Sequence, residues 1–189
     1  VALRGKVKLY TKDYSGAKAD FEEIVKDPEG RGYGYRLNDS YPALFTLEAD
    51  QSAEMIFSIQ CVNGTNNNYG LAYCLRLGTR AAFGGCWNNN MPTDILADMY
   101  EYKDGRPFNW DDIYPGFSTD RAMQKSIFEA KLSADKKSVA EYPSDKDKIR
   151  AIYESRDPRL EQTLITPYSH FLGCNGRTPK EMEYVLAVG

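Results

Sequence analysis

Trp87 is followed directly by Asn88, Asn89 and Asn90, and the chemistry of this run suits a ligand rich in hydroxyl groups. An indole has the largest flat apolar face of any side chain, and a carboxamide both donates and accepts hydrogen bonds. A sugar ring has C–H groups on one face and hydroxyls around its edge, so it can use both kinds of contact. The run therefore predicts a ligand-binding surface with Trp87 as its aromatic platform.

The same combination occurs upstream, where Asn68 precedes Tyr69. Arg76 or Arg80 could add a planar guanidinium that forks onto two neighbouring hydroxyls. All of these residues fall in residues 63–91, a stretch with little periodicity, and long irregular loops in domains are often functional. The alternative interpretation is that Trp87 anchors this loop to the core while the asparagines adopt turn conformations, which they tolerate well.

Trp110 is a second aromatic candidate, flanked by Phe108, Asn109, Asp111 and Asp112. It follows a turn at Asp104 and Gly105, and we expect it to be a buried anchor.

Two guanidinium groups, one carboxylate and a proline occur together at residues 156–160. Pro158 fixes its own φ and pushes Asp157 toward an extended conformation, so the Asp157 carboxylate can turn back to accept bonds from a guanidinium or a backbone amide. We therefore predict a structural clasp that consists of Arg156, Asp157 and Arg159.

Catalytic groups are poorly represented in the sequence. Neighbouring side chains on a helix or a strand point apart, so Asp111 and Asp112 do not form a ready pair of glycosidase carboxylates. His170 is the single histidine and lies in no nucleophile motif, which favours a structural role. We expect a binding protein without catalytic residues, with a glycoside hydrolase as a remote alternative.

No metal site and no cofactor are expected. The cysteines lack both a C-x-x-C pair and a neighbouring histidine, and no alternating acidic loop for calcium occurs. Disulfide pairing among them is left open by the sequence; they are Cys61, Cys74, Cys86 and Cys174.

The formal net charge of −3 over 189 residues excludes a strongly basic surface, so nucleic acid is not an expected partner. No apolar run is long enough to cross a bilayer. The chain opens at Val1 inside a helical pattern with no capping residue ahead of it, which indicates a fragment of a longer protein.

Apolar spacing predicts a helix over residues 2–10 and a second one, capped by Asp13 or Ser15, that ends at Val25. Such a helical hairpin buries its apolar face poorly alone and usually stacks on similar units, as in tetratricopeptide arrays. Further along, we predict a strand at residues 54–60, a helix from residue 95 to about 102, and a terminal helix from the Thr178-Pro179 start signal to about residue 187.

Four segments, in their order and rough spacing, resemble the SusD/RagB family. These are residues 12–19, 52–60, 92–93 with 98–105, and 156–160. The resemblance implies a mainly α fold that combines a tetratricopeptide-like helical hairpin (residues 1–28) with an irregular, loop-rich, ligand-binding part containing short strands (residues 29–189), together a single partial domain.

The resemblance also implies a function. Members of the family are outer-membrane lipoproteins of Bacteroidetes-type bacteria that lie on the cell surface over a TonB-dependent transporter of the SusC type. They capture oligosaccharides, and some capture peptides, for import, and they are not enzymes. We therefore expect oligosaccharide capture, with peptide capture as the alternative, and membrane attachment only through a lipid anchor that is missing from this chain.

Overall fold

The computed structural model describes residues 1–26, 33–49, 51–58, 76–79, 86–175 and 178–188. The chain divides into two compact units, Val1–Gly70 and Leu71–Gly189. The described residues are rich in helix with a few short strands, in line with the predicted fold class. The predicted boundary at residue 28 lies outside the described residues.

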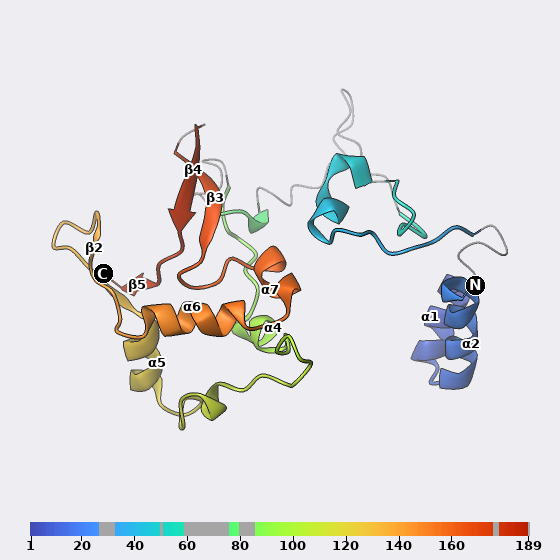
Figure 1. Cartoon of the computed structure of the whole chain (residues 1–189), viewed down its shortest axis with the longest axis horizontal. Helices are drawn as coiled ribbons and strands as arrows, with labels where there is room; N and C mark the ends of the chain where they lie inside the picture. Colours follow the sequence, from blue (N-terminus) through green and yellow to red (C-terminus); the bar gives the residue numbers. More distant parts are fainter. Residues whose placement is uncertain (27–32, 50, 59–75, 80–85, 176–177, 189) are drawn as a thin grey trace. The chain divides into compact units, whose positions relative to one another are not determined.

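The first unit begins with the predicted helical hairpin, formed by α1 (Ala2–Tyr10) and α2 (Tyr14–Val25) (Figure 1). Asp13 is the cap of the second helix, since its Oδ1 accepts a bond of 2.9 Å from the Gly16 amide. Ser15, the other predicted cap, donates to the same carboxylate oxygen. One side chain therefore fixes the short link. An Asp at the N-cap position commonly accepts such a bond from a backbone amide of the first turn.

The two helices approach closely at Gly5. A Cβ atom built there would lie 2.7 Å from a ring carbon of Phe21 on α2, so glycine is required for this contact. The hairpin itself is thus confirmed, whereas its stacking in a tetratricopeptide-like array stays a prediction.

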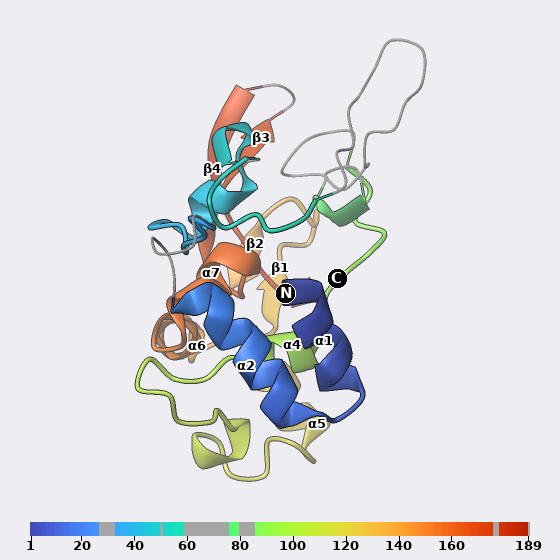
Figure 2. The ribbon, with the colours of Figure 1, turned by 90° about the vertical axis from the view of Figure 1, so that its right-hand side faces the viewer.

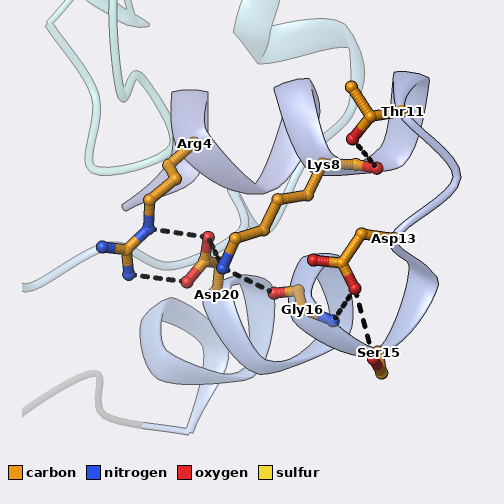
Figure 3. A network of polar contacts seen from close by, with 7 residues as sticks. All are labelled: Arg4, Lys8, Thr11, Asp13, Ser15, Gly16 and Asp20. Carbon is orange, nitrogen blue, oxygen red and sulfur yellow. Dashed lines mark hydrogen bonds and ion pairs between the residues drawn. The ribbon is translucent and has the colours of Figure 1, made fainter.

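Asp20 on α2 is buried against α1 and is held by two cations (Figure 3). Arg4 donates from Nε and Nη2 to the two carboxylate oxygens at 2.9 and 2.7 Å, and Lys8 Nζ lies 3.0 Å from Oδ2. The bonds from Arg4 are the largest cause of an Asp20 pKa far below the usual range of a carboxyl group. The ionised form of Asp20 is therefore part of the hairpin interface.

The rest of the first unit has two 3₁₀ turns, Pro42–Phe45 and Leu47–Ala49. The strand predicted at residues 54–60 is wrong for the part that is described, because residues 54–58 form turns and bends. Glu54 instead accepts a bond of 2.7 Å from the Asn38 amide, and Phe57 is exposed. A β-propensity pattern gives a strand only where a partner strand is available, and the described residues of this unit supply none.

The second unit contains four α-helices and one 3₁₀ turn among its described residues (Figure 1). In chain order they are α4 (Asp94–Asp98), the turn Trp110–Asp112, α5 (Arg121–Phe128), α6 (Lys146–Glu154) and α7 (Pro158–Thr163). Helix α6 packs against both α5 and α7. It carries three buried apolar residues, Ile149, Ile152 and Tyr153, into the core.

Two small sheets complete the second unit. The first has the strand order β2 (Val139–Glu141), β1 (Ala130–Leu132) and β5 (Ala187–Val188), with an antiparallel and then a parallel pairing. The second is an antiparallel hairpin of β3 (His170–Asn175) and β4 (Thr178–Glu183), whose strands lie side by side in both views (Figure 2).

The terminal helix predicted from Thr178 is therefore wrong. The residues read as its cap and first turn form β4 instead, and the register runs from His170 opposite Glu183 to Asn175 opposite Thr178. Capping signals describe only local preference, and here a six-residue ladder with a neighbouring strand outweighs them. A cross-strand contact of 3.0 Å joins His170 Nδ1 and Glu181 Oε1.

Arg156 is the largest fully buried side chain of the second unit, with 1% of its surface exposed. Its guanidinium donates to Ala97 O at 2.8 Å, to Asp98 O at 3.2 Å and, from two nitrogens, to the carbonyl of Tyr100. The plane of the group covers the Phe108 ring, with Cζ 3.3 Å from the ring centroid. One side chain thus joins segments that are more than 50 residues apart in the sequence.

These bonds explain where α4 ends. The last carbonyl groups of a helix have no partner inside the helix, and here a guanidinium satisfies them at Ala97 and Asp98. Helix α4 consequently ends at Asp98, whereas the sequence predicted an end near residue 102.

The three residues of the predicted clasp do not form one charged cluster. Arg156 points into the core, while Asp157 caps α7 by accepting a bond of 2.9 Å from the Arg159 amide. The Arg159 guanidinium also binds this carboxylate and is the main cause of a lowered pKa of Asp157, about 2. The clasp therefore has a buried part and a separate exposed part.

We expect the replacement Arg156→Ala to lower the free energy of unfolding by about 2–4 kcal/mol, because it leaves buried carbonyl oxygens unpaired and a cavity over Phe108. Arg159→Ala is the matched control: its guanidinium is largely exposed, so the loss should stay below about 1 kcal/mol. Urea unfolding followed by circular dichroism measures both values. Equal losses in the two variants would contradict the assigned role of Arg156.

Asp20→Asn should destabilise the helical hairpin in a pH-dependent way. Because the pKa of Asp20 is lowered in the folded state, its contribution is fully present above the pKa of the unfolded chain, about 4, and is lost as the pH falls through the lower folded-state value. The difference in urea midpoint between wild type and variant should therefore be constant above pH about 5 and shrink below it. Asp39→Asn, an exposed carboxylate of the same unit, is the control. A difference that persists undiminished in acid would rule out the ion pair as its source.

Candidate functional site

The segment predicted to bind ligand begins with a buried residue and continues into solvent. Cys86 has 4% of its surface exposed, whereas Trp87 has 61%. An anchor of the loop would have to be buried, so Cys86 fills that position and Trp87 does not. The indole presents much of its area on the surface of the second unit.

Backbone bonds hold this segment in place. The amide of Asn88 donates to Gly78 O at 3.1 Å, and the amides of Asn89 and Asn90 donate to Arg76 O at 2.8 and 3.1 Å. Asn88 has a φ of +52°, a left-handed conformation that asparagine tolerates better than most residues. Asn88 therefore has the backbone conformation that the alternative interpretation expected of an asparagine, whereas Trp87 is not the buried anchor of that interpretation.

The side chains of all three asparagines are exposed. Asn88 Nδ2 donates to the Met91 thioether at 3.1 Å, a weak acceptor that sequence analysis did not single out. The bonds that fasten Asn89 and Asn90 to Arg76 use their backbone amides and not their carboxamides. They lie next to an exposed indole and can exchange water for a ligand.

The structure brings part of the predicted site together. Trp87, Asn88 and Asn90 belong to one exposed segment, and the backbone of Arg76 lies against it. Three other predicted site residues lie outside the described residues: Asn68, Tyr69 and Arg80. Their part in the site stays a prediction.

Trp110 has the opposite environment, with only 8% of its surface exposed. Its indole N–H donates to Asp98 Oδ1 at 2.9 Å, and its ring stacks on Phe117 with the centroids 5.0 Å apart. Trp110 is therefore a residue of the buried core, as its sequence context predicts.

The carboxylates considered for catalysis have local structural partners. Asp111 Oδ1 accepts bonds from the backbone amides of Gly116 and Ser118, and Asp112 accepts one from Asn109. Within the ranges that the structure describes, no group of three His, Cys, Asp or Glu side chains is placed to hold a metal ion.

A helix-rich frame that presents an aromatic ring and carboxamides to solvent is the arrangement expected of a ligand-binding protein. The model of the SusD family matches residues 53–186, well over half of the chain. The chain belongs to the SusD family, which confirms the resemblance seen in its sequence. No curated protein and no solved structure gives a significant match.

Family membership gives the general function. Proteins of this family are nutrient-binding proteins of the cell surface, in general without catalytic activity, and are typically outer-membrane lipoproteins. Among the described helices, none is both long and apolar enough to cross a membrane.

The contrast between the two tryptophans predicts a fluorescence result. Trp87→Ala should remove the emission component at longer wavelength that acrylamide quenches strongly, because Trp87 is exposed, and should leave the blue-shifted, weakly quenched emission of the buried Trp110. Stern–Volmer quenching of wild type and variant measures this difference. If the variant remains as quenchable as the wild type, the two side chains do not have the environments described above.

Proposed function

We propose that this chain captures oligosaccharides at the surface around Trp87 and presents them to a TonB-dependent transporter of the SusC type. Family membership supports a nutrient-binding role in general. The observation that carries the specific proposal is the exposure of Trp87, 61%, directly beside three exposed carboxamides.

The proposed contacts follow from the chemistry of the two partners. The apolar face of a sugar ring stacks on the Trp87 indole, and the hydroxyls at the ring edge bind the carboxamides of Asn88 and Asn90, which both donate and accept. Arg76 can also take part in binding. Its backbone carbonyl accepts hydrogen bonds from the amides of Asn89 and Asn90, so its side chain begins next to this loop. Asn68, Tyr69 and Arg80 belong to the same proposed site on sequence grounds.

Binding takes place without cleavage in this proposal. Retaining glycosidases hold two carboxyl groups about 5 Å apart across the sugar bond. The exposed segment from Trp87 to Asn90 contains no carboxylate at all. Incubation with oligosaccharides should therefore produce no new reducing ends.

Trp87→Ala should weaken oligosaccharide binding about tenfold or more, because stacking on the indole supplies most of the apolar contact. Tyr10→Ala, which removes an exposed aromatic ring from the first unit, is the matched control and should bind as the wild type does. A glycan array identifies the ligand, and calorimetry with that ligand gives the affinities.

A peptide library tested beside the array separates the two ligand classes. Binding of peptides alone would replace the oligosaccharide proposal by the peptide alternative. Unchanged affinity of Trp87→Ala for the ligand found would remove Trp87 from the site, and the release of reducing ends would point to a hydrolase.

A further inference from the structure

A cavity of about 590 Å³ opens in the second unit, beside the core. It is within the size range of small-molecule sites, about 300–1,000 Å³. Its apolar wall contains Trp110 and Phe117, stacked 5.0 Å apart, and Phe128, which meets the indole edge-on at 5.4 Å. Trp87 does not line it, so this cavity is distinct from the proposed oligosaccharide surface.

The charged residues that line the cavity are all acidic. They are Asp94, Asp98 and Asp111, and no Lys, Arg or His is among its described lining residues. Arg156 is the cation that acts on Asp98, but its hydrogen bonds go to the backbone carbonyls of Ala97, Asp98 and Tyr100. Burial raises the pKa of Asp98, which indicates a carboxylate whose charge is incompletely compensated.

Tyr153 also lines the cavity and adds a hydroxyl group to its wall. Only 8% of this residue is exposed, and none of the hydrogen bonds found among the described residues involves its hydroxyl. Three other tyrosines of the same unit are satisfied: Tyr114 donates to Asp145, Tyr142 to Glu183 and Tyr168 to Phe128 O. A tyrosine hydroxyl can both donate a hydrogen bond to a ligand and accept one from it.

We propose that this cavity binds an organic ammonium group, carried by an amino sugar or by a lysine side chain. The aromatic side chains of the wall offer π-electron density to a cation. Asp94 and Asp98 supply the negative charge, and the Tyr153 hydroxyl accepts one N–H of the ammonium group. The cavity is thus a second site, whose ligand class goes beyond neutral oligosaccharides.

Other ligand classes fit the lining less well. A metal ion needs several oxygen ligands that converge, and the described residues contain no group of three metal-binding side chains. A phosphate or carboxylate would meet three aspartates without a lysine or arginine in the lining. A neutral sugar would leave the negative charge of the cavity uncompensated.

The test uses Trp87→Ala as the background, because the chain has two tryptophans and Trp110 is then the only one. Glucosamine trisaccharide is titrated beside its fully N-acetylated counterpart, and Gly-Lys-Gly beside the same peptide with an acetylated lysine. Each pair differs only in the charge on nitrogen and the acetyl group. We expect at least one amine to change Trp110 emission with an affinity about tenfold or more above that of its acetylated partner.

Two variants in the same background locate the binding site. Asp94→Asn removes one charge at an exposed position and should weaken amine binding about fivefold to tenfold. Asp147→Asn, which removes an exposed charge away from the cavity lining, is the matched control and should leave the affinity unchanged. Tyr153→Phe should weaken binding about threefold without loss of stability, because the deleted hydroxyl makes no hydrogen bond to another described residue.

Binding of glucosamine alone, of the lysine peptide alone, or of both identifies the source of the ammonium group. The proposal is overturned if amines and acetylated ligands bind alike, if no amine changes Trp110 emission, or if Asp94→Asn and Asp147→Asn behave identically. Since the background lacks the Trp87 platform, failure here does not affect the oligosaccharide proposal, and failure of that proposal does not affect this one.

Discussion

The buried guanidinium of Arg156 is the interaction on which the second unit depends. It binds the carbonyl oxygens of Ala97, Asp98 and Tyr100 and covers the Phe108 ring, so it fixes the end of α4 against the segment that leads into α7. Phe108 in turn packs edge-on against Trp110, the centre of the aromatic core. Its Nε and Nη2 donate to these carbonyls, whereas Nη1 is buried without a partner among the described residues. Because burial of a guanidinium is costly unless it is hydrogen-bonded, the bonds from Nε and Nη2 favour this pairing of the two segments.

Once that frame is in place, the two tryptophans take opposite roles. Trp110 gives its indole N–H to Asp98 and is enclosed by other rings, whereas Trp87 follows the buried Cys86 and extends into solvent. The backbone amides of Asn88 to Asn90 hold the exposed loop through the carbonyls of Gly78 and Arg76. A rigid core and an adaptable polar surface are what a nutrient-binding protein of the SusD family needs.

The cavity beside Trp110 depends on the same frame. Asp98 holds the indole with one carboxylate oxygen and lines the cavity, and Tyr153 joins the core with its ring while its hydroxyl has no partner among the described residues. Aromatic rings and carboxylates that serve stability therefore also define the chemistry of the cavity wall. An aromatic surface at Trp87 for neutral rings and an acidic cavity for an ammonium group would let one chain bind ligands that carry both kinds of group.

The sequence alone determined the features that depend on residues close together in the chain. The periodicity of α1 and α2, a cap at Asp13 or Ser15 and the carboxylate of Asp157 turned back onto the start of α7 were all predictable, because each is a local preference. Family membership could also be recognised from four short segments.

Only the tertiary structure decided that the residues from Thr178 form a strand paired with β3. It also decided that the partner of the Arg156 guanidinium is the end of α4 and not the Asp157 carboxylate. Those outcomes depend on partners distant in sequence, whose bonds outweigh local propensities of a few tenths of a kcal/mol per residue.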